Sequence, residues 1–179
     1  MTPKQILFVC TGNSCRSVMA QGLLQKRLKE LEPQLREPVD VASAGVFAID
    51  GMSPSRETLR LLAQEGVDMT AHMARGLSPD MARQAAMIFV MELFQLEEIV
   101  RRVPDVKDKV FLLKTFGLGD AAKRVDINIP DPISRPREVY EACFATIRDA
   151  VERVADAIVK SQSASGPGSS GPGSSGISA

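Results

Sequence analysis

Residues 4–17 read KQILFVCTGNSCRS, and this stretch decides the fold. Its first half, residues 5–9, is a continuous apolar run, which predicts a strand that is buried on both faces. Beyond Ser17, apolar side chains recur at helical spacing over residues 18–31, with glutamine and lysine between them. The stretch is therefore predicted to form a buried strand, a tight loop and an amphipathic helix, in that order.

The alternation of strand and helix patterns continues along the chain. Further strands are predicted over 39–44, 86–91 and 110–113. Helices are predicted over 54–65, where Ser53 is the expected N-cap, and over 92–102 and 137–160. Parallel strands need crossover connections, so this order indicates an α/β domain with a parallel sheet. Functional loops in such sheets follow the carboxyl ends of the strands, which makes the loop after the first strand the expected site.

Composition narrows the class of protein. Of 179 residues 44% are apolar, and 22 basic side chains balance 22 acidic ones, so nucleic acid and acidic membranes are not expected partners. The apolar runs are too short for a membrane span, and the first residues do not resemble a signal peptide. The three cysteines, Cys10, Cys15 and Cys143, then indicate a reducing, cytoplasmic location.

The last part of the chain differs in composition. Residues 161–179 contain GPGSSGPGSSG and almost no apolar side chains. Such a segment buries too little surface to offset its ordering entropy, so it is predicted to be a disordered tail. The folded domain is predicted to cover residues 1–160.

The loop after the first strand has the composition of an anion site. Several backbone amides at a strand-to-helix junction can point at one anion, and the helix dipole favours negative charge there. Gly12 and Asn13 tolerate the positive φ that such a loop requires, and the Arg16 guanidinium matches two phosphate oxygens. We expect the loop to bind a tetrahedral dianion without a metal, through Thr11, Gly12, Asn13, Ser14, Cys15, Arg16 and Ser17.

Cys10 stands at the start of this loop, where the same dipole and guanidinium favour its thiolate form. A thiolate below a bound phosphoryl group is placed for in-line attack, and the Ser17 hydroxyl could donate to the sulfur when it leaves. Two other interpretations are a buried structural cysteine and a phosphate-binding loop without chemistry. The Walker spacing and its lysine are absent, which argues against nucleotide binding.

Thiolate attack on a phosphoryl group needs a proton for the leaving group, so a carboxylic acid must approach from another loop. Asp131 is the candidate, because Pro130 and Pro132 restrict the backbone on either side of it. The alternative is a turn aspartate, which is common beside proline. Asp126 is a weaker candidate for the acid.

These residues resemble the low-molecular-weight protein tyrosine phosphatase family of bacterial type. The match comprises FVCTGNSCRS, the SAG of residues 43–45, the stretch 72–75, and Asp131-Pro132. The resemblance implies one flavodoxin-like domain with a four-stranded parallel sheet and helices on both faces. It implies a phosphocysteine on Cys10, phosphate binding by Arg16 and acid–base catalysis by Asp131. The substrate would be a phosphorylated protein, the product inorganic phosphate, and no cofactor would be needed.

The resemblance also implies roles for residues that spacing alone does not single out. Ser43 and His72 would support the loop together with Asn13 and Ser17. Cys15 would be a redox partner that forms a reversible disulfide with Cys10, although a small buried residue at this position is an equal alternative. Cys143 is expected in the core of the last helix.

At three positions that bear on the substrate, the sequence departs from the pattern of tyrosine-directed family members. Tyrosine-directed members usually have a bulky aliphatic residue at the position of Ser14 and aromatic residues at the positions of Ile133 and Ser134. Phosphotyrosine is the family default, whereas members directed at phosphoarginine carry a hydroxyl residue at the Ser14 position, so both substrates stay open. The loop is also similar to that of thioredoxin-coupled arsenate reductases. Those enzymes need two further cysteines after the third strand, and residues 91–103 hold none.

Overall fold

The computed structural model describes residues 4–164 and contains one four-stranded sheet. Its strands are all parallel and lie in the order β2-β1-β3-β4. Their bounds are β1 Lys4–Cys10, β2 Val39–Gly45, β3 Met87–Val90 and β4 Val110–Leu112. The predicted parallel sheet of four strands is confirmed.

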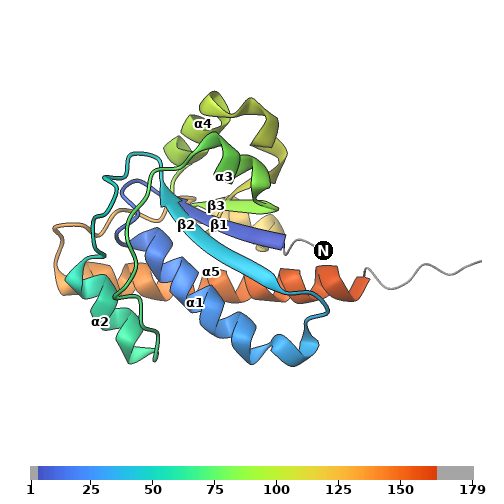
Figure 1. Ribbon diagram of the computed structural model, residues 1–179, viewed down its shortest axis with the longest axis horizontal. Coiled ribbons are helices and arrows are strands. Elements are labelled where there is room, and N and C mark those ends of the chain that lie inside the picture. The colour runs from blue at the N-terminus through green and yellow to red at the C-terminus, as the bar shows by residue number, and fades with distance from the viewer. Residues whose placement is uncertain (1–3, 165–179) are drawn as a thin grey trace, which may run out of the picture.

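Helices cover both faces of the sheet, as Figure 1 shows. On one face lie α1 (Arg16–Glu30) and α5 (Arg137–Ala164), with α2 (Arg56–Gln64) packed against both. On the other face lie α3 (Pro79–Gln84) and α4 (Leu93–Arg102). Three short 3₁₀ helices, Glu32–Gln34, Pro104–Lys109 and Gly119–Arg124, occupy connecting segments. The result is the three-layer α/β architecture that the sequence predicts.

The alternation of side chains along β1 divides the core into two parts. Phe8 points towards α1 and α5, where it packs with Phe89, and Leu7 and Val9 point towards α3 and α4. All these side chains are fully buried. A strand that is covered on both faces cannot alternate in polarity, which is why its sequence is apolar throughout.

Two helix boundaries differ from the predictions. Helix α2 begins at Arg56, and its N-cap is Ser55, whose hydroxyl accepts from the Thr58 amide, so the expected cap at Ser53 is wrong. Helix α5 continues past residue 160 to Ala164, because Gln162 is buried and bonds the backbone of residues 36 and 37. The rest of the predicted tail, residues 165–179, lies outside the described residues.

The sheet order determines where the functional loop lies. From β1 the chain crosses to β2 on one side and later returns to β3 on the other, so β1 and β3 flank a topological switch point. The loop after β1 and the start of α4 after β3 meet above this point. Within residues 4–164, no helix has both the length and the apolar character needed to cross a membrane.

Candidate active site

The loop between β1 and α1, residues 11–15, curls around the sulfur of Cys10. Asn13 adopts a φ of 55°, in the left-handed region, and its amide donates to Cys10 Sγ over 3.2 Å. Helix α1 begins at Arg16 without a side-chain N-cap, whereas α2 and α3 are capped by Ser55 and Ser78. The amides of the first turn of α1 are therefore left for another acceptor, and the positive end of the helix favours an anion there.

A second donor to the Cys10 sulfur comes from α1. Ser17 Oγ lies 3.0 Å from Cys10 Sγ and accepts a hydrogen bond of 2.9 Å from Asn13 Nδ2. Because a lone pair of Ser17 Oγ accepts the hydrogen bond from Asn13 Nδ2, the hydroxyl proton of Ser17 is free to point at the Cys10 sulfur. A thiolate at Cys10 would thus accept from the Asn13 amide and the Ser17 hydroxyl.

Asn13 also fixes the loop to the rest of the fold. It is fully buried, and its Nδ2 donates to Ser43 Oγ on β2 as well as to Ser17, both over 2.9 Å. Its Oδ1 accepts from the Arg75 amide over 3.0 Å, and the Ser43 hydroxyl donates to Gln21 Oε1 over 2.6 Å. The Nδ2 and Oδ1 atoms of the Asn13 side chain are therefore all hydrogen-bonded, as a buried polar network requires.

His72 lies beside the same loop, with Nε2 3.3 Å from the Asn13 carbonyl oxygen. Burial lowers the pKa of His72, the Asn13 carbonyl opposes this effect, and the charge of Arg75 adds to it. The ring is therefore neutral at neutral pH and donates Nε2–H to the carbonyl. Ser43 and His72 both lie where the resemblance implies, against the loop.

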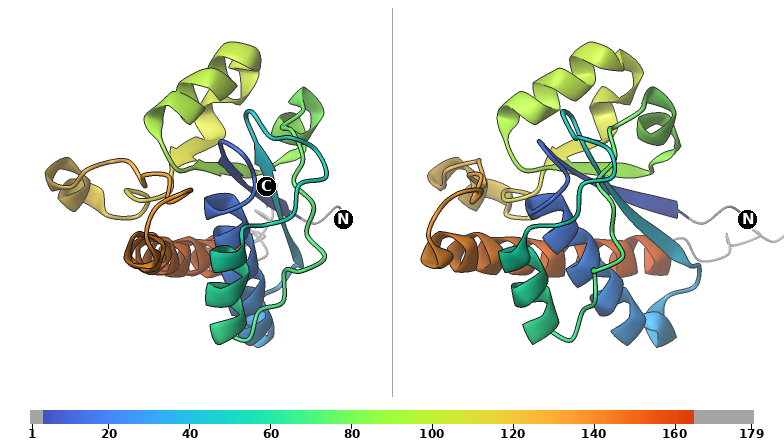
Figure 2. Two further views of the ribbon diagram at one scale, coloured as in Figure 1. Left: turned by 90° about the vertical axis from the view of Figure 1, so that its left-hand side faces the viewer. Right: turned by 60° about the vertical axis from the view of Figure 1, so that its left-hand side comes forward.

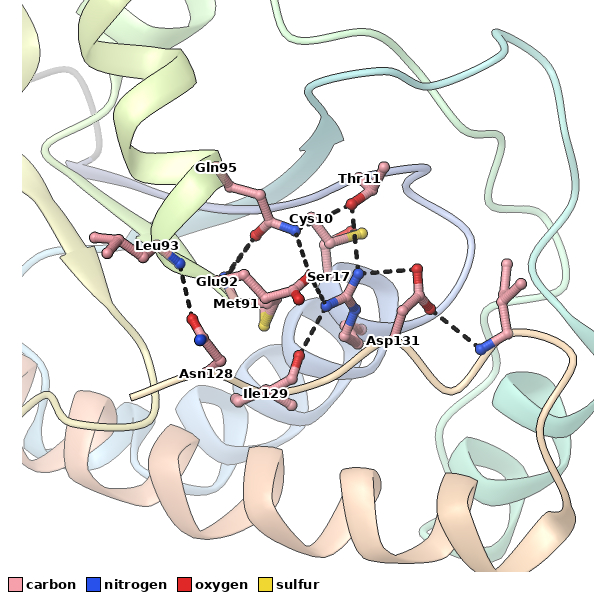
Figure 3. Close-up of polar contacts among 12 residues, drawn as sticks. Cys10, Thr11, Ser17, Met91, Glu92, Leu93, Gln95, Asn128, Ile129 and Asp131 are labelled. Atoms are coloured by element: carbon pink, nitrogen blue, oxygen red, sulfur yellow. Dashed lines mark hydrogen bonds and ion pairs between the residues drawn. The ribbon is translucent and has the colours of Figure 1, made fainter. Parts of the chain in front are cut away.

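Arg16 is almost completely buried, with 1% of its surface exposed, and carboxylates hold it on two sides (Figure 3). Nη1 donates to Glu92 Oε2 over 2.5 Å and to the Ile129 carbonyl over 2.7 Å, and Nη2 lies 2.9 Å from Asp131 Oδ2. Burial disfavours the charged form, but the charges of Cys10, Glu92 and Asp131 outweigh it and raise the pKa of Arg16.

The remaining donor of this guanidinium is unused. Arg16 Nε is buried and has no hydrogen-bond partner among the described residues. A buried N–H without a partner costs free energy unless a ligand accepts from it. Together with the uncapped start of α1, this donor indicates a site for an oxyanion above Cys10.

Asp131 belongs to a constrained turn that carries it to this site. Its Oδ1 accepts from the Ile133 amide over 3.2 Å, and the Arg135 amide donates to the Pro132 carbonyl over 3.0 Å. Its side chain is 42% exposed, so the carboxyl faces both Arg16 and the solvent. Asp126, the weaker candidate, instead bonds the Asn128 amide and lies 4.0 Å from Lys114. The structure thus brings Asp131 to Arg16 and leaves Asp126 on the surface.

The sequence analysis missed two residues of the site, Glu92 and Gln95. Gln95 is fully buried; its Oε1 accepts the Glu92 amide over 3.1 Å and its Nε2 donates to Thr11 Oγ1 over 3.2 Å. Figure 3 shows the two side chains next to each other, and Gln95 Nε2 also donates to Glu92 Oε2 over 3.4 Å. Glutamate followed three residues later by glutamine, directly after a strand, is a capping-box signal that could have identified them.

All three cysteines are free thiols. The Cys15 thiol is buried, donates to Ser55 Oγ over 3.2 Å and lies 3.8 Å from the Tyr140 hydroxyl. Cys143 is buried on α5, and burial, more than its neighbours' charges, raises its pKa to about 12. The disulfide between Cys10 and Cys15 stays a prediction.

Comparison with known proteins places this geometry in a family. The model of the family "Low molecular weight phosphotyrosine protein phosphatase" matches residues 5–164. A protein-arginine-phosphatase of Geobacillus stearothermophilus is 37% identical over 89% of this chain and 99% of its own length. The tyrosine phosphatase Wzb of Escherichia coli K12 is 31% identical over 88% of this chain and 97% of its own.

Solved structures agree with this assignment. The YwlE arginine phosphatase from Geobacillus stearothermophilus superimposes with a TM-score of 0.80 and 35% identity, over 93% of this chain and 99% of its own. The chain therefore belongs to the low molecular weight phosphotyrosine protein phosphatase family and is a cysteine-dependent protein phosphatase.

Proposed function

We propose that Cys10 is the nucleophile of this phosphatase and that phosphoarginine in proteins is its preferred substrate. The observation that carries the catalytic assignment is the arrangement around one sulfur. Two donors point at Cys10 Sγ. Among the residues that the structure describes, no side chain caps the first turn of α1 and none accepts from the buried Nε of Arg16. A phosphoryl group above the sulfur would accept from the amides of the first turn of α1 and from Arg16 Nε.

The reaction then takes two steps. Cys10 Sγ attacks phosphorus while the bond from phosphorus to the substrate nitrogen or oxygen breaks, and protonated Asp131 gives its proton to that leaving atom. Water next attacks the phosphocysteine, the Asp131 carboxylate takes its proton, and the S–P bond breaks to release inorganic phosphate. Ser17 donates to the departing sulfur from 3.0 Å and stabilises its negative charge.

The preference for phosphoarginine is supported by the walls of the site. Ser14 places a small hydroxyl side chain in the loop, where it is half-buried, instead of the apolar wall that suits an aromatic ring. The leaving group of phosphoarginine is a guanidinium. Once Asp131 has given up its proton, its carboxylate can pair with this cation. The protein-arginine-phosphatase of Geobacillus stearothermophilus is also more similar to this chain than Wzb is, with 37% identity against 31% over nearly equal shares of the chain.

Phosphotyrosine is the second candidate. The family description names it, and Wzb of Escherichia coli carries the tyrosine phosphatase name. Phe47 lies beside the loop, because its amide donates to the Thr11 carbonyl over 2.9 Å, and its ring could contact a phenyl group.

The deciding experiment compares two peptides of the same sequence, one with phosphoarginine and one with phosphotyrosine, by the rate of phosphate release. We expect a higher kcat/KM for the phosphoarginine peptide, and Ser14→Ile should shift the preference towards phosphotyrosine by adding an apolar wall. A higher kcat/KM for phosphotyrosine in the unmodified protein would overturn the substrate assignment.

Two variants test the catalytic residues. Cys10→Ser should abolish turnover while phosphate still binds. Asp131→Asn should slow substrates with poor leaving groups by about 10²- to 10⁴-fold and affect para-nitrophenyl phosphate much less, because its leaving group hardly needs a proton. Arsenate-dependent oxidation of thioredoxin would instead favour the reductase alternative.

A further inference from the structure

Four large apolar side chains project into solvent on one side of the active site. We call them the apolar rim: Phe47, Ile49, Met52 and Met73, which are 58%, 70%, 51% and 58% exposed. Single exposed apolar residues are ordinary on protein surfaces, but a group of them usually marks a binding surface.

Backbone hydrogen bonds attach the rim directly to the loop that holds Cys10. The Phe47 amide donates to the Thr11 carbonyl, and the Ser55 amide donates to the Ser14 carbonyl, both over 2.9 Å. On the Met73 side, Ala74 accepts from the Gly51 amide and donates to the Met52 carbonyl, both over 2.8 Å, and the Arg75 amide donates to Asn13 Oδ1 in the catalytic loop over 3.0 Å. Figure 2 shows the segment after β2 running beside the loop after β1. The rim is therefore continuous with the catalytic loop.

The rim is also held in place rather than loosely attached. Arg102 lies over the Phe47 ring, with the guanidinium carbon 5.0 Å from the ring centre, and donates to the Val46 carbonyl over 2.9 Å. Asp50 Oδ1 accepts from the Gly76 amide over 2.7 Å. A surface that is ordered before binding loses less conformational entropy when a partner docks.

Exposed apolar side chains are concentrated around this site. Of the eight large ones among residues 4–164, seven lie on segments bonded to the catalytic loop or next to Glu92 and Asp131. Four of these seven are the apolar rim, and the other three, Leu93, Phe94 and Ile133, follow Glu92 or Asp131 closely in the sequence. The eighth, Val125, lies outside these segments. This concentration links the apolar surface to the substrate rather than to a remote partner.

We propose that the apolar rim binds apolar side chains that flank the phosphorylated residue in the protein substrate. The inference rests on the proposed function. A phosphorylated side chain with its phosphorus at Cys10 must leave its own backbone at the mouth of the site, where the rim begins. An extended chain rises about 3.3 Å per residue, so side chains two to four positions away lie roughly 7–13 Å further along and contact this surface.

The test uses two peptides with the same phosphorylated residue, one flanked by leucine and phenylalanine and the other by serine and glycine. The phosphorylated residue is the one that the side-by-side assay prefers. We expect kcat/KM for the apolar peptide to be higher by about tenfold, a difference typical of a few buried apolar contacts. Equal values for the two peptides would overturn the proposal.

Variants separate the rim from the catalytic loop. The double change Ile49→Ser and Met73→Ser should reduce the preference to about twofold while turnover of para-nitrophenyl phosphate stays unchanged. Val125→Ser, which removes an exposed apolar side chain elsewhere, is the matched control and should retain the full preference. A preference that survives the double change would also contradict the proposal.

Binding measurements distinguish failure of the rim from failure of the proposed function. Fluorescence anisotropy titrations of the two labelled peptides with the Cys10→Ser variant need no turnover. They therefore measure whether the rim favours the apolar peptide even if the unmodified protein hydrolyses neither peptide. Loss of all phosphate release would count against the catalytic assignment alone. A dimer in size-exclusion chromatography that Ile49→Ser dissociates would show that the rim binds a second copy, and the proposal would be wrong.

Discussion

The Glu92→Gln change tests how the fold orients Arg16. Glu92 holds Nη1 together with the Ile129 carbonyl, which leaves the edge formed by Nε and Nη2 on the side of the catalytic loop. A phosphate group is bound best by two parallel donors of one guanidinium edge. The Glu92 carboxylate therefore fixes which edge of the guanidinium faces the substrate. Glutamine should hold the guanidinium less firmly, because the glutamine side chain is uncharged.

The expected magnitude follows from burial. Removing one partner of a fully buried ion pair costs about 3–5 kcal/mol. Here Arg16 is 1% exposed but Glu92 is 23% exposed, and Asp131 and the Ile129 carbonyl remain bonded to the guanidinium. Glutamine can also still accept from Nη1. We therefore expect a loss of about 1–2 kcal/mol in the free energy of unfolding, at the scale of a charged hydrogen bond.

Catalysis should also become slower when Arg16 is less firmly oriented. We expect kcat/KM for para-nitrophenyl phosphate to decrease by about fivefold in Glu92→Gln and by about tenfold or more in Glu92→Ala, which removes the acceptor as well. Urea denaturation and initial rates measure the two effects. Exposed Glu97 on the same helix provides the matched control, Glu97→Gln. If Glu92→Gln matches this control in both stability and rate, Arg16 is oriented without the carboxylate and the reasoning fails.

Three further outcomes are expected. Gly45→Ala should lower stability by about 1–3 kcal/mol and abolish most activity, measured by thermal unfolding and turnover, because its Cβ would lie 2.6 Å from the Thr11 carbonyl oxygen. Burial lowers the pKa of His72 below the 6.5 of the unfolded chain, so the unfolded state binds the proton more readily and stability decreases as the pH falls below about 6.5. Urea denaturation should show that decrease in the unmodified protein, and His72→Gln should show less of it; equal pH dependence would contradict this cause. Iodoacetamide at a pH of about 8 should alkylate Cys10, and added phosphate should slow that reaction, as mass spectrometry would show. Cys143 should stay unmodified, since burial raises its pKa to about 12.

The parts of the site that are local in sequence could be predicted from it. Residues 5–17 contain the strand, the turn residues and the start of the helix, so the catalytic loop follows from apolar runs and backbone preferences. Glu92 joins the site from 76 positions beyond Arg16, and only the sheet order brings them together. Helix α3 has six residues, too few for its periodicity to be recognised.

Tertiary contacts also explain the two errors at helix boundaries. The Ser55 amide donates to the Ser14 carbonyl, which fixes residue 55 in an extended conformation beside the catalytic loop, so α2 starts after it rather than at Pro54. Gln162 bonds backbone groups at residues 36 and 37, and this pairing extends α5 into the polar segment. Neither contact is visible in local composition, because each joins segments more than 40 residues apart.

In the proposed mechanism, Arg16 connects phosphate binding to acid catalysis by Asp131 through an exchange of partners. In this structure Nη2 lies 2.9 Å from the Asp131 carboxylate, whereas Nε has no hydrogen-bond partner within residues 4–164. A phosphoryl dianion that takes both donors must displace Asp131 and at the same time repel its charge. The Asp131 side chain would then be released from Arg16 towards the leaving atom, where the proposed first step needs a proton donor. After the leaving group departs, the carboxyl has lost its proton and can accept one from water. We propose that this ion pair satisfies the buried guanidinium when no substrate is bound, and that phosphate binding releases Asp131 for catalysis.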